Sequence, residues 1–406
     1  MSRIGDAFRQ TFSGIKTQLT SSNKGTHPVT LKSTGALGDF ILASALQHAL
    51  GERGFNVGII NPAFAHPLWN YFPVIRGHTV RFFPTPADVP AGETVVDIST
   101  YLRHFPHSDK IPGGHGRKGH LSEWMGIEFL AKGGDQVLTN ANINPNTLHV
   151  SPSNVQIYLT DGTNTMEVEQ GLDLVRRVGG GQPVIVVAPL AAPMLPDRNA
   201  LGPKDLRPAT VTYIGQTIRA LGGVPALQGP VDQYNRLTAR DAHCIDAYAV
   251  IDRPTDIRIT PALLLAADGV ISVESAPIHL AAGAYQGTTK AATEKGLRNL
   301  SKIIAIVGSS SREASEYGTS ADNKTQTIET ISTCPIVAAT LRCGNHGYHP
   351  PAQYTAHFQR LLGAGQVFSA DTFCVHTQPT DVHNCMTTLN HDDLAVRLER
   401  LIRDRP

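Results

Sequence analysis

The amino-acid sequence predicts an α/β protein built from two doubly wound domains that face each other across a cleft. Short, mostly apolar runs typical of buried parallel strands alternate with helical segments. This alternation is interrupted once, at the GGGQ stretch of residues 179–182. A chain of 406 residues is also longer than one ordinary domain, which favours two hydrophobic cores. Since open α/β sheets bind ligands at the carboxyl ends of their strands, we expect function in the cleft.

The first domain is expected over residues 26–180. Val29–Leu31 predicts its first strand, and the apolar stripe from Ile41 to Leu50 predicts the helix that follows. The runs NVGII (residues 56–60) and TVVDI (residues 94–98) are typical of further buried strands. These segments form the βαβ pattern of a parallel sheet.

The second domain is expected over residues 181–345 and repeats the pattern. Helices are predicted at residues 211–221 and from Ile278 onward. The predicted strands share a continuous apolar character and lie at residues 184–187, 224–227, 269–273 and 303–307.

The two ends of the chain carry segments that lie outside the two expected domains. Residues 1–25 predict an amphipathic helix and a linker, with apolar side chains at helical spacing from Ile4 to Leu19. This helix is expected to pack on its own body or on a partner subunit, and peripheral contact with a membrane surface is the alternative. Residues 346–406 predict a cysteine-containing tail and a closing helix. Packed, reduced thiols are expected, with metal binding or disulfides as alternatives for Cys334, Cys343, Cys374 and Cys385.

Composition describes an ordinary globular protein, with 41% hydrophobic and 17% charged residues. The formal net charge of +1 gives no overall attraction to nucleic acid or to an anionic bilayer. No apolar run approaches the roughly 18 to 20 residues that cross a bilayer, and the N-terminus lacks the apolar core of a secretory signal. A cytoplasmic location is therefore expected.

The first candidate site is the turn GALGD, residues 35–39, between the first strand and its helix. Its glycines allow a sharp turn and a close approach to a ligand. Asp39 stands where an aspartate commonly caps a helix or interacts with the helix dipole. The same position also suits a general base, so the two roles remain open on spacing alone.

The second candidate site is the segment ESAPIHLAAG, which begins at Glu274. Ser275 and Ala276 would present backbone N–H groups at a helix start, Pro277 suits the first turn, and His279 follows on that turn. Such a terminus attracts a diphosphate, while Glu274 could accept hydrogen bonds from sugar hydroxyls. An ordinary capped helix is the alternative.

Taken together and in order, these segments resemble the heptosyltransferase-like glycosyltransferases, glycosyltransferase family nine. That family opens on a glycine-Asp turn similar to GALGDF. Its second domain carries an Asp-Ser/Thr-Gly-Pro-x-His-x-Ala-Ala segment similar to ESAPIHLAA. The segments APLAAP, KDLRP and LQGPVD fall where the family has donor-side loops, and HNCMTTLNHDDLAVRLERLI resembles its closing helix. The resemblance spans residues 27–402 and implies two Rossmann-like domains in the GT-B arrangement.

The resemblance implies an inverting glycosyltransferase whose donor is a nucleoside-diphosphate sugar and which needs no metal or other cofactor. It makes Asp39, beside Gly38, the catalytic base and assigns the donor diphosphate to the turn from Ser275 through Ala276 and Pro277 to His279. Lys204 or Arg207 would neutralise phosphate. Glu274 and Ala276 replace the family's aspartate and glycine, which leaves the sugar open. No Asp-x-Asp metal motif occurs in the sequence.

The acceptor is expected on the first domain. A basic, glycine-rich stretch there would suit a saccharide, a phosphorylated lipid-linked glycan or a modified base in nucleic acid. A solvated loop is the alternative. Its basic residues are Arg103, His104, His107, Lys110, His115, Arg117, Lys118 and His120. Two other functions remain as alternatives, namely a nucleotide-sugar epimerase of similar fold and a nucleotide-sugar binding protein without catalysis.

Overall fold

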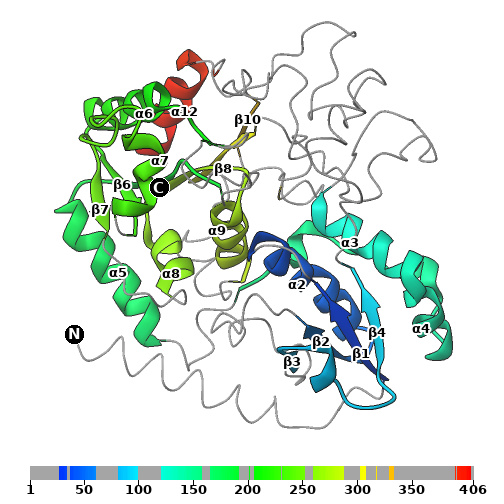
Figure 1. The fold of residues 1–406 in the computed structure, drawn as a ribbon. Coiled ribbons are helices and arrows are strands. Elements are labelled where there is room, and N and C mark those ends of the chain that lie inside the picture. The colour runs from blue at the N-terminus through cyan, green and yellow to red at the C-terminus, as the bar shows by residue number, and fades with distance from the viewer. Residues whose placement is uncertain are drawn as a thin grey trace, which may run out of the picture.

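The computed structural model contains two parallel β-sheets, each with the strand order of a doubly wound fold (Figure 1). It describes residues 27–33, 37–60, 81–98, 120–157, 165–191, 201, 205–229, 231–251, 259–287, 302–307, 317, 329–332, 389 and 391–403. The expected N-terminal helix, most of the basic stretch and the four tail cysteines lie outside these residues.

The first sheet has the order β3-β2-β1-β4. Its strands are β1 (His27–Lys32), β2 (Phe55–Ile60), β3 (Arg81–Phe83) and β4 (Thr94–Asp97). All three pairings are parallel, with Val29 opposite both Val57 and Thr94. The predicted strands at residues 29–31, 56–60 and 94–98 are confirmed, whereas β3 has no counterpart in the prediction.

The second sheet has the order β10-β9-β8-β5-β6-β7. Its strands are β5 (Val184–Ala188), β6 (Val224–Gln228), β7 (Ala249–Ile251), β8 (Gly269–Val273), β9 (Ile303–Val307) and β10 (Glu329–Ser332). These pairings are parallel too, and Ile185 lies opposite both Pro225 and Gly269. In chain order the strands run 3-2-1-4-5-6, the arrangement of a Rossmann fold. The prediction of two Rossmann-like α/β domains is confirmed by this topology.

The longer helices cover these sheets. They are α2 (Leu37–Gly51), α3 (Leu121–Phe129), α5 (Thr165–Gly179), α6 (Pro208–Ala220), α8 (Ile259–Ala266), α9 (Ala276–Gly287) and α12 (His391–Arg403). The shorter turns of helix are η2 (Pro86–Asp88), η4 (Leu130–Gly134), α4 (Asp135–Asn140), η5 (Pro145–Thr147), η6 (Pro152–Asn154), η7 (Val231–Tyr234) and α7 (Asn235–Thr238). Among the described helices, none is both long and apolar enough to span a bilayer.

The second sheet is buried on both faces because alternate side chains of each strand point to opposite cores. On one face, Ile185 and Val187 join an outer core that includes side chains of α6 and α12. On the other face, Val184 and Val186 join an inner core shared with the first domain. This two-sided burial explains why the strands read as continuous apolar runs rather than as alternating ones.

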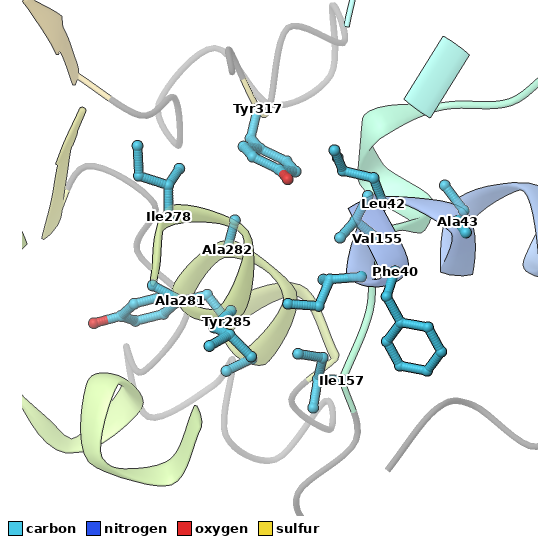
Figure 2. Close-up of a cluster of buried hydrophobic side chains, with 14 of the residues drawn as sticks. Phe40, Leu42, Ala43, Val155, Ile157, Ile278, Ala281, Ala282, Tyr285 and Tyr317 are labelled. Carbon is cyan, nitrogen blue, oxygen red and sulfur yellow. The ribbon is translucent and has the colours of Figure 1, made fainter. Parts of the chain in front are cut away.

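The inner core continues without interruption from one sheet to the other. Val29 and Leu31 of β1 lie in the same cluster of buried side chains as Val184 and Val186 of β5. Helices α2 and α9 meet at the centre of this cluster. Figure 2 shows side chains of both helices there, together with Val155 and Ile157 of the connecting segment. The two domains are therefore joined by packed apolar surface as well as by the chain.

The boundary expected near residue 181 stays a prediction. The GGGQ stretch does end a helix, since α5 stops at Gly179. Gly180 and Gly181 then turn the chain with φ values of 55° and 93°, which glycine adopts without steric cost. Helix α5 itself packs on α8 and on strands of the second sheet. Helix α5, although it precedes the expected boundary, therefore packs on the second domain.

Candidate active site

The turns after β1 and β8 are placed side by side, although they are far apart in the sequence. Helix α2 begins at Leu37 and helix α9 at Ala276. A β-carbon added to Gly38 would lie 3.1 Å from Cδ2 of His279 and 3.7 Å from the backbone nitrogen of Ala276. The missing side chain of Gly38 therefore lets the start of one helix approach the start of the other.

Both turns also stand where a doubly wound fold binds ligands. In the second sheet, β5 lies between β6 and β8, so the strand order reverses direction between β5 and β8. In the first sheet, the corresponding point lies between β1 and β4. Crevices at the carboxyl ends of the strands next to such switch points are the usual ligand sites. Asp39 lies in the first turn of α2 and is partly exposed.

At the start of α9, hydrogen bonds fix the turn, while three of its residues remain partly exposed. The Ser275 hydroxyl donates to the Val273 carbonyl at 3.2 Å, and the backbone N–H of Ile278 donates to the Ser275 carbonyl at 3.1 Å. Ser275, Ala276 and Pro277 remain partly exposed, whereas Glu274 is buried. The helix dipole and the terminal N–H groups favour an anion at this end.

His279 is buried on the first turn of α9, and its Nδ1 lies 2.6 Å from the hydroxyl of Tyr317. Tyr317 is fully buried beyond the end of β9 (Figure 2). Burial, followed by the nearby Glu274 carboxylate, raises the pKa of Tyr317 well above its ordinary value. The phenol therefore keeps its proton. Tyr317 was missed by the sequence prediction, because only its place after a buried strand points to this end of the sheet.

His120 reaches the same cluster from the first domain. It is the N-cap of α3, where its Nδ1 accepts a hydrogen bond from the Ser122 backbone N–H at 3.2 Å. The ring centroids of His120 and Tyr317 are 4.4 Å apart in an edge-to-face arrangement. Burial, and then the proximity of His279, hold the pKa of His120 well below its ordinary value. His120 is therefore neutral and enclosed, and does not belong to a solvated basic loop.

The segment before α6 was expected to supply a phosphate-binding cation. It is held by an ion pair and hydrogen bonds close to the end of β5. Asp205 and Arg236 form a buried ion pair with a separation of 2.9 Å. Asp205 also accepts from the backbone N–H of Ala191 at 2.8 Å, and Arg236 donates to the Ala191 carbonyl at 2.6 Å. The ion pair and these two hydrogen bonds to Ala191 fix the two loops relative to each other.

Arg207 follows this pinned segment directly and is the N-cap of α6. Its side chain is buried, and the residue before it, Leu206, donates its backbone N–H to the Pro189 carbonyl just after β5 at 2.9 Å. Lys204, the other candidate cation, lies outside the described residues. Within the described part of the chain, no three His, Cys, Asp or Glu side chains are grouped so as to hold a metal ion.

Solved glycosyltransferase structures are similar to this chain over most of its length. Glycosyl transferase family 9 from Veillonella parvula covers 95% of the chain and 99% of its own length, at 11% identity and a TM-score of 0.49. ADP-heptose lipopolysaccharide heptosyltransferase II of E. coli covers 93% and 99%, at 13% identity and a TM-score of 0.47.

A third similar structure is that of the iron-containing dodecameric heptosyltransferase TibC of E. coli, in complex with ADP-D-β-D-heptose. It covers 95% of this chain and 78% of its own, at 10% identity and a TM-score of 0.49. No protein-family model and no curated protein sequence matches the chain. The fold assignment rests on the order and register of the strands in the two sheets.

Proposed function

We propose that the chain is an inverting glycosyltransferase that moves a sugar from a nucleoside-diphosphate sugar to an acceptor hydroxyl. The observation that carries this proposal is the contact of Gly38 with Ala276 and His279. It brings the start of α2, whose first turn carries Asp39, next to an anion-attracting helix start on the second domain. An isolated aspartate near a helix start would most simply be a cap, whereas one carried where two helix N-termini meet is placed to act on a donor bound there.

The reaction assigns complementary roles to the two helix starts. The Asp39 carboxylate takes the proton from the acceptor hydroxyl as the oxygen attacks the anomeric carbon. The bond from that carbon to the diphosphate oxygen breaks, and the electron pair leaves with the diphosphate. Negative charge then grows at the start of α9, where backbone N–H groups, the helix dipole and His279 can stabilise it.

Further residues support the donor. Arg207, and Lys204 beyond the described residues, are the cations proposed to offset phosphate charge. Buried Glu274 is proposed to accept hydrogen bonds from sugar hydroxyls at the end of β8. Because Glu274 is one methylene longer than the aspartate of the resembling family, the sugar pocket should differ in shape. ADP-heptose, the sugar nucleotide of two of the similar heptosyltransferases, is thus one donor to test among several.

Ligand-linked thermal stabilisation tests the donor site directly. The full chain is heated with ADP, UDP, GDP and CMP and with their sugar conjugates. At about 100 times the dissociation constant, the matching nucleotide should add about 2.7 kcal/mol to the free energy of unfolding. His279→Gln should weaken this stabilisation, whereas His243→Gln, an exposed histidine of the same domain, should leave it intact.

Other outcomes identify the alternatives. If no nucleotide stabilises the protein, the proposed function is wrong. If a donor binds and is isomerised without an acceptor, the chain is an epimerase. If it binds and neither transfer nor isomerisation occurs with a wide acceptor set, the chain is a nucleotide-sugar binding protein.

A further inference from the structure

A buried polar cluster joins three segments of the chain immediately behind the proposed donor site. His120 comes from the N-cap of α3, His279 from α9, and Tyr317 from the residues beyond β9. Their relative exposures are 2%, 3% and 0%. The ring centroids of His279 and Tyr317 are 5.9 Å apart, and those of the two histidines are 6.5 Å apart. Since leaving a buried donor unsatisfied costs free energy, the position of the hydrogen shared by Tyr317 and His279 can be worked out.

The hydrogen of the Tyr317 hydroxyl has one acceptor among the described residues. Among the described residues, the hydrogen-bond partner of the Tyr317 hydroxyl is Nδ1 of His279. If Nδ1 carried the hydrogen and donated it, the phenol O–H would be left without an acceptor in a site closed to water. An unsatisfied buried donor costs about 1–3 kcal/mol. Tyr317 therefore donates and His279 Nδ1 accepts, which places the hydrogen of the neutral imidazole on Nε2.

The donor nitrogen of His279 then lies on the ring edge that faces Gly38, at the start of α2. Cδ2, to which Nε2 is bonded, belongs to the edge opposite Nδ1. This Cδ2 is the atom that lies 3.1 Å from a β-carbon built on Gly38. The ring therefore presents its acceptor edge to Tyr317 and its N–H edge toward the meeting point of α2 and α9.

His120 packs against Tyr317 and is itself uncharged. Its Nδ1 accepts from Ser122 N–H, so its own hydrogen is on Nε2 as well. That Nε2 is buried and has no hydrogen-bond partner in the described part of the chain. The edge-to-face packing on Tyr317 at 4.4 Å fixes the phenol ring. A neutral neighbour also leaves the hydrogen bond between Tyr317 and His279 undisturbed.

We propose that Tyr317 is a positioning residue that holds His279 as its Nε2–H tautomer, so that His279 donates a hydrogen bond to the departing diphosphate. This inference rests on the proposed function for the identity of the anion, but not for the tautomer. Removing the phenol oxygen leaves Nδ1 without its donor, and both tautomers become accessible. A fraction of the molecules would then present a lone pair, rather than an N–H, to a negatively charged oxygen.

The test compares Tyr317→Phe with Tyr285→Phe. Tyr285 is also buried, lies on α9 with His279, and has a hydroxyl with no hydrogen-bond partner in the described part of the chain. Both substitutions delete one buried oxygen, but only Tyr317→Phe removes a partner of His279. Long-range ¹H–¹⁵N spectra of the full chain with ¹⁵N-labelled histidine report the tautomer, and loss of a signal in His279→Gln identifies His279.

The wild type and Tyr285→Phe should show the Nε2–H pattern for His279, and Tyr317→Phe a mixture of both tautomers. With the donor found by thermal shift, kcat should fall at least about 10-fold in Tyr317→Phe while KM changes little. An Nδ1–H tautomer in the wild type, or identical spectra and kcat in both variants, overturns the inference. If no nucleotide sugar is bound or turned over, the role in transfer is overturned, while the spectra still decide whether Tyr317 sets the tautomer.

Discussion

At the scale of single residues, the candidate site is formed by residues of each domain that contact residues of the other. His279 of the second domain touches Gly38 of the first, and His120 of the first packs on Tyr317 of the second. Each contact crosses between the domains, and each involves a group that is buried or lacks a side chain. Residues that define the candidate site therefore also hold the domains in register.

His120 predicts how stability depends on pH. Its pKa in the folded protein is well below the ordinary value of 6.5, so below about pH 6.5 the unfolded chain binds a proton that the native state does not. Stability should fall as the pH drops through this window, by up to about 1.4 kcal/mol per pH unit. Burial also lowers the pKa of His48, despite the nearby Glu52 carboxylate, and this adds a contribution of the same sign.

Urea unfolding at several pH values between about 5.5 and 7.5 measures this slope. His120→Asn keeps an N-cap acceptor and removes the titrating ring, so its stability should depend less on pH than that of the wild type. His48→Gln should flatten the slope independently, since the two sites share no partner. An unchanged slope in His120→Asn would show that His120 is not held neutral by the fold.

Most single residues of the candidate site could be named from the sequence, but their partners could not. Asp39 and His279 follow apolar strands at recognisable turns, so local pattern identifies them. Tyr317 and His120 carry no such signal, because their importance comes from convergence of segments that are distant along the chain. The basic stretch also misled the interpretation of His120, since a histidine among cations is indistinguishable by sequence from a buried N-cap.

At the scale of elements, residues 152–157 are hydrogen-bonded to α9, and we call this segment the strap. The backbone N–H of Ile157 donates to the Gly283 carbonyl at 2.9 Å. The Gln286 side chain donates to the carbonyls of Pro152 and Val155 at 3.1 and 2.8 Å. These bonds hold the strap directly on the helix that carries the proposed donor site.

Gly287→Ala should loosen this strap. A β-carbon at residue 287 would lie 2.1 Å from the carbonyl oxygen of Ile157, and backbone cannot move aside as a side-chain tip can. We expect a loss of about 1–3 kcal/mol in the free energy of unfolding, measured by urea titration. Gly283→Ala is the matched control, because its β-carbon would meet side-chain atoms rather than backbone, at 3.0 Å from Ile157 and 3.7 Å from Val155. Equal losses in the two variants would contradict this account of the strap.

Strands that form apolar runs of about five residues were predictable, whereas shorter strands and a helix without a polar face were not. Strands β5, β8 and β9 are five-residue runs buried on every position or nearly so. By contrast, β3 and β7 have three residues each, too few for a period to be recognised. Helix α8 is apolar on most sides, because it is covered by both α5 and α9, and its pattern therefore lacks a polar face.

At the scale of the whole molecule, two Rossmann-like sheets share the inner core. The point in each sheet where the strand order reverses lies near the contact between α2 and α9. The sequence pattern predicts the two sheets, since each repeats the same alternation of strand and helix. It cannot predict the contact between α2 and α9, because surface complementarity between domains leaves no periodic signal. That contact turns two ordinary helix starts into a candidate site for group transfer.

The most direct test of this account is the rate of sugar transfer by Asp39→Asn, measured with the donor identified by thermal shift. The amide keeps the shape of the side chain but cannot take the acceptor proton, so kcat should fall by about 10²–10⁴-fold while donor affinity stays within a few-fold. Asp135→Asn, at an exposed aspartate in the first turn of α4, should transfer at the wild-type rate. Wild-type turnover by Asp39→Asn would contradict the assignment of Asp39 as the base.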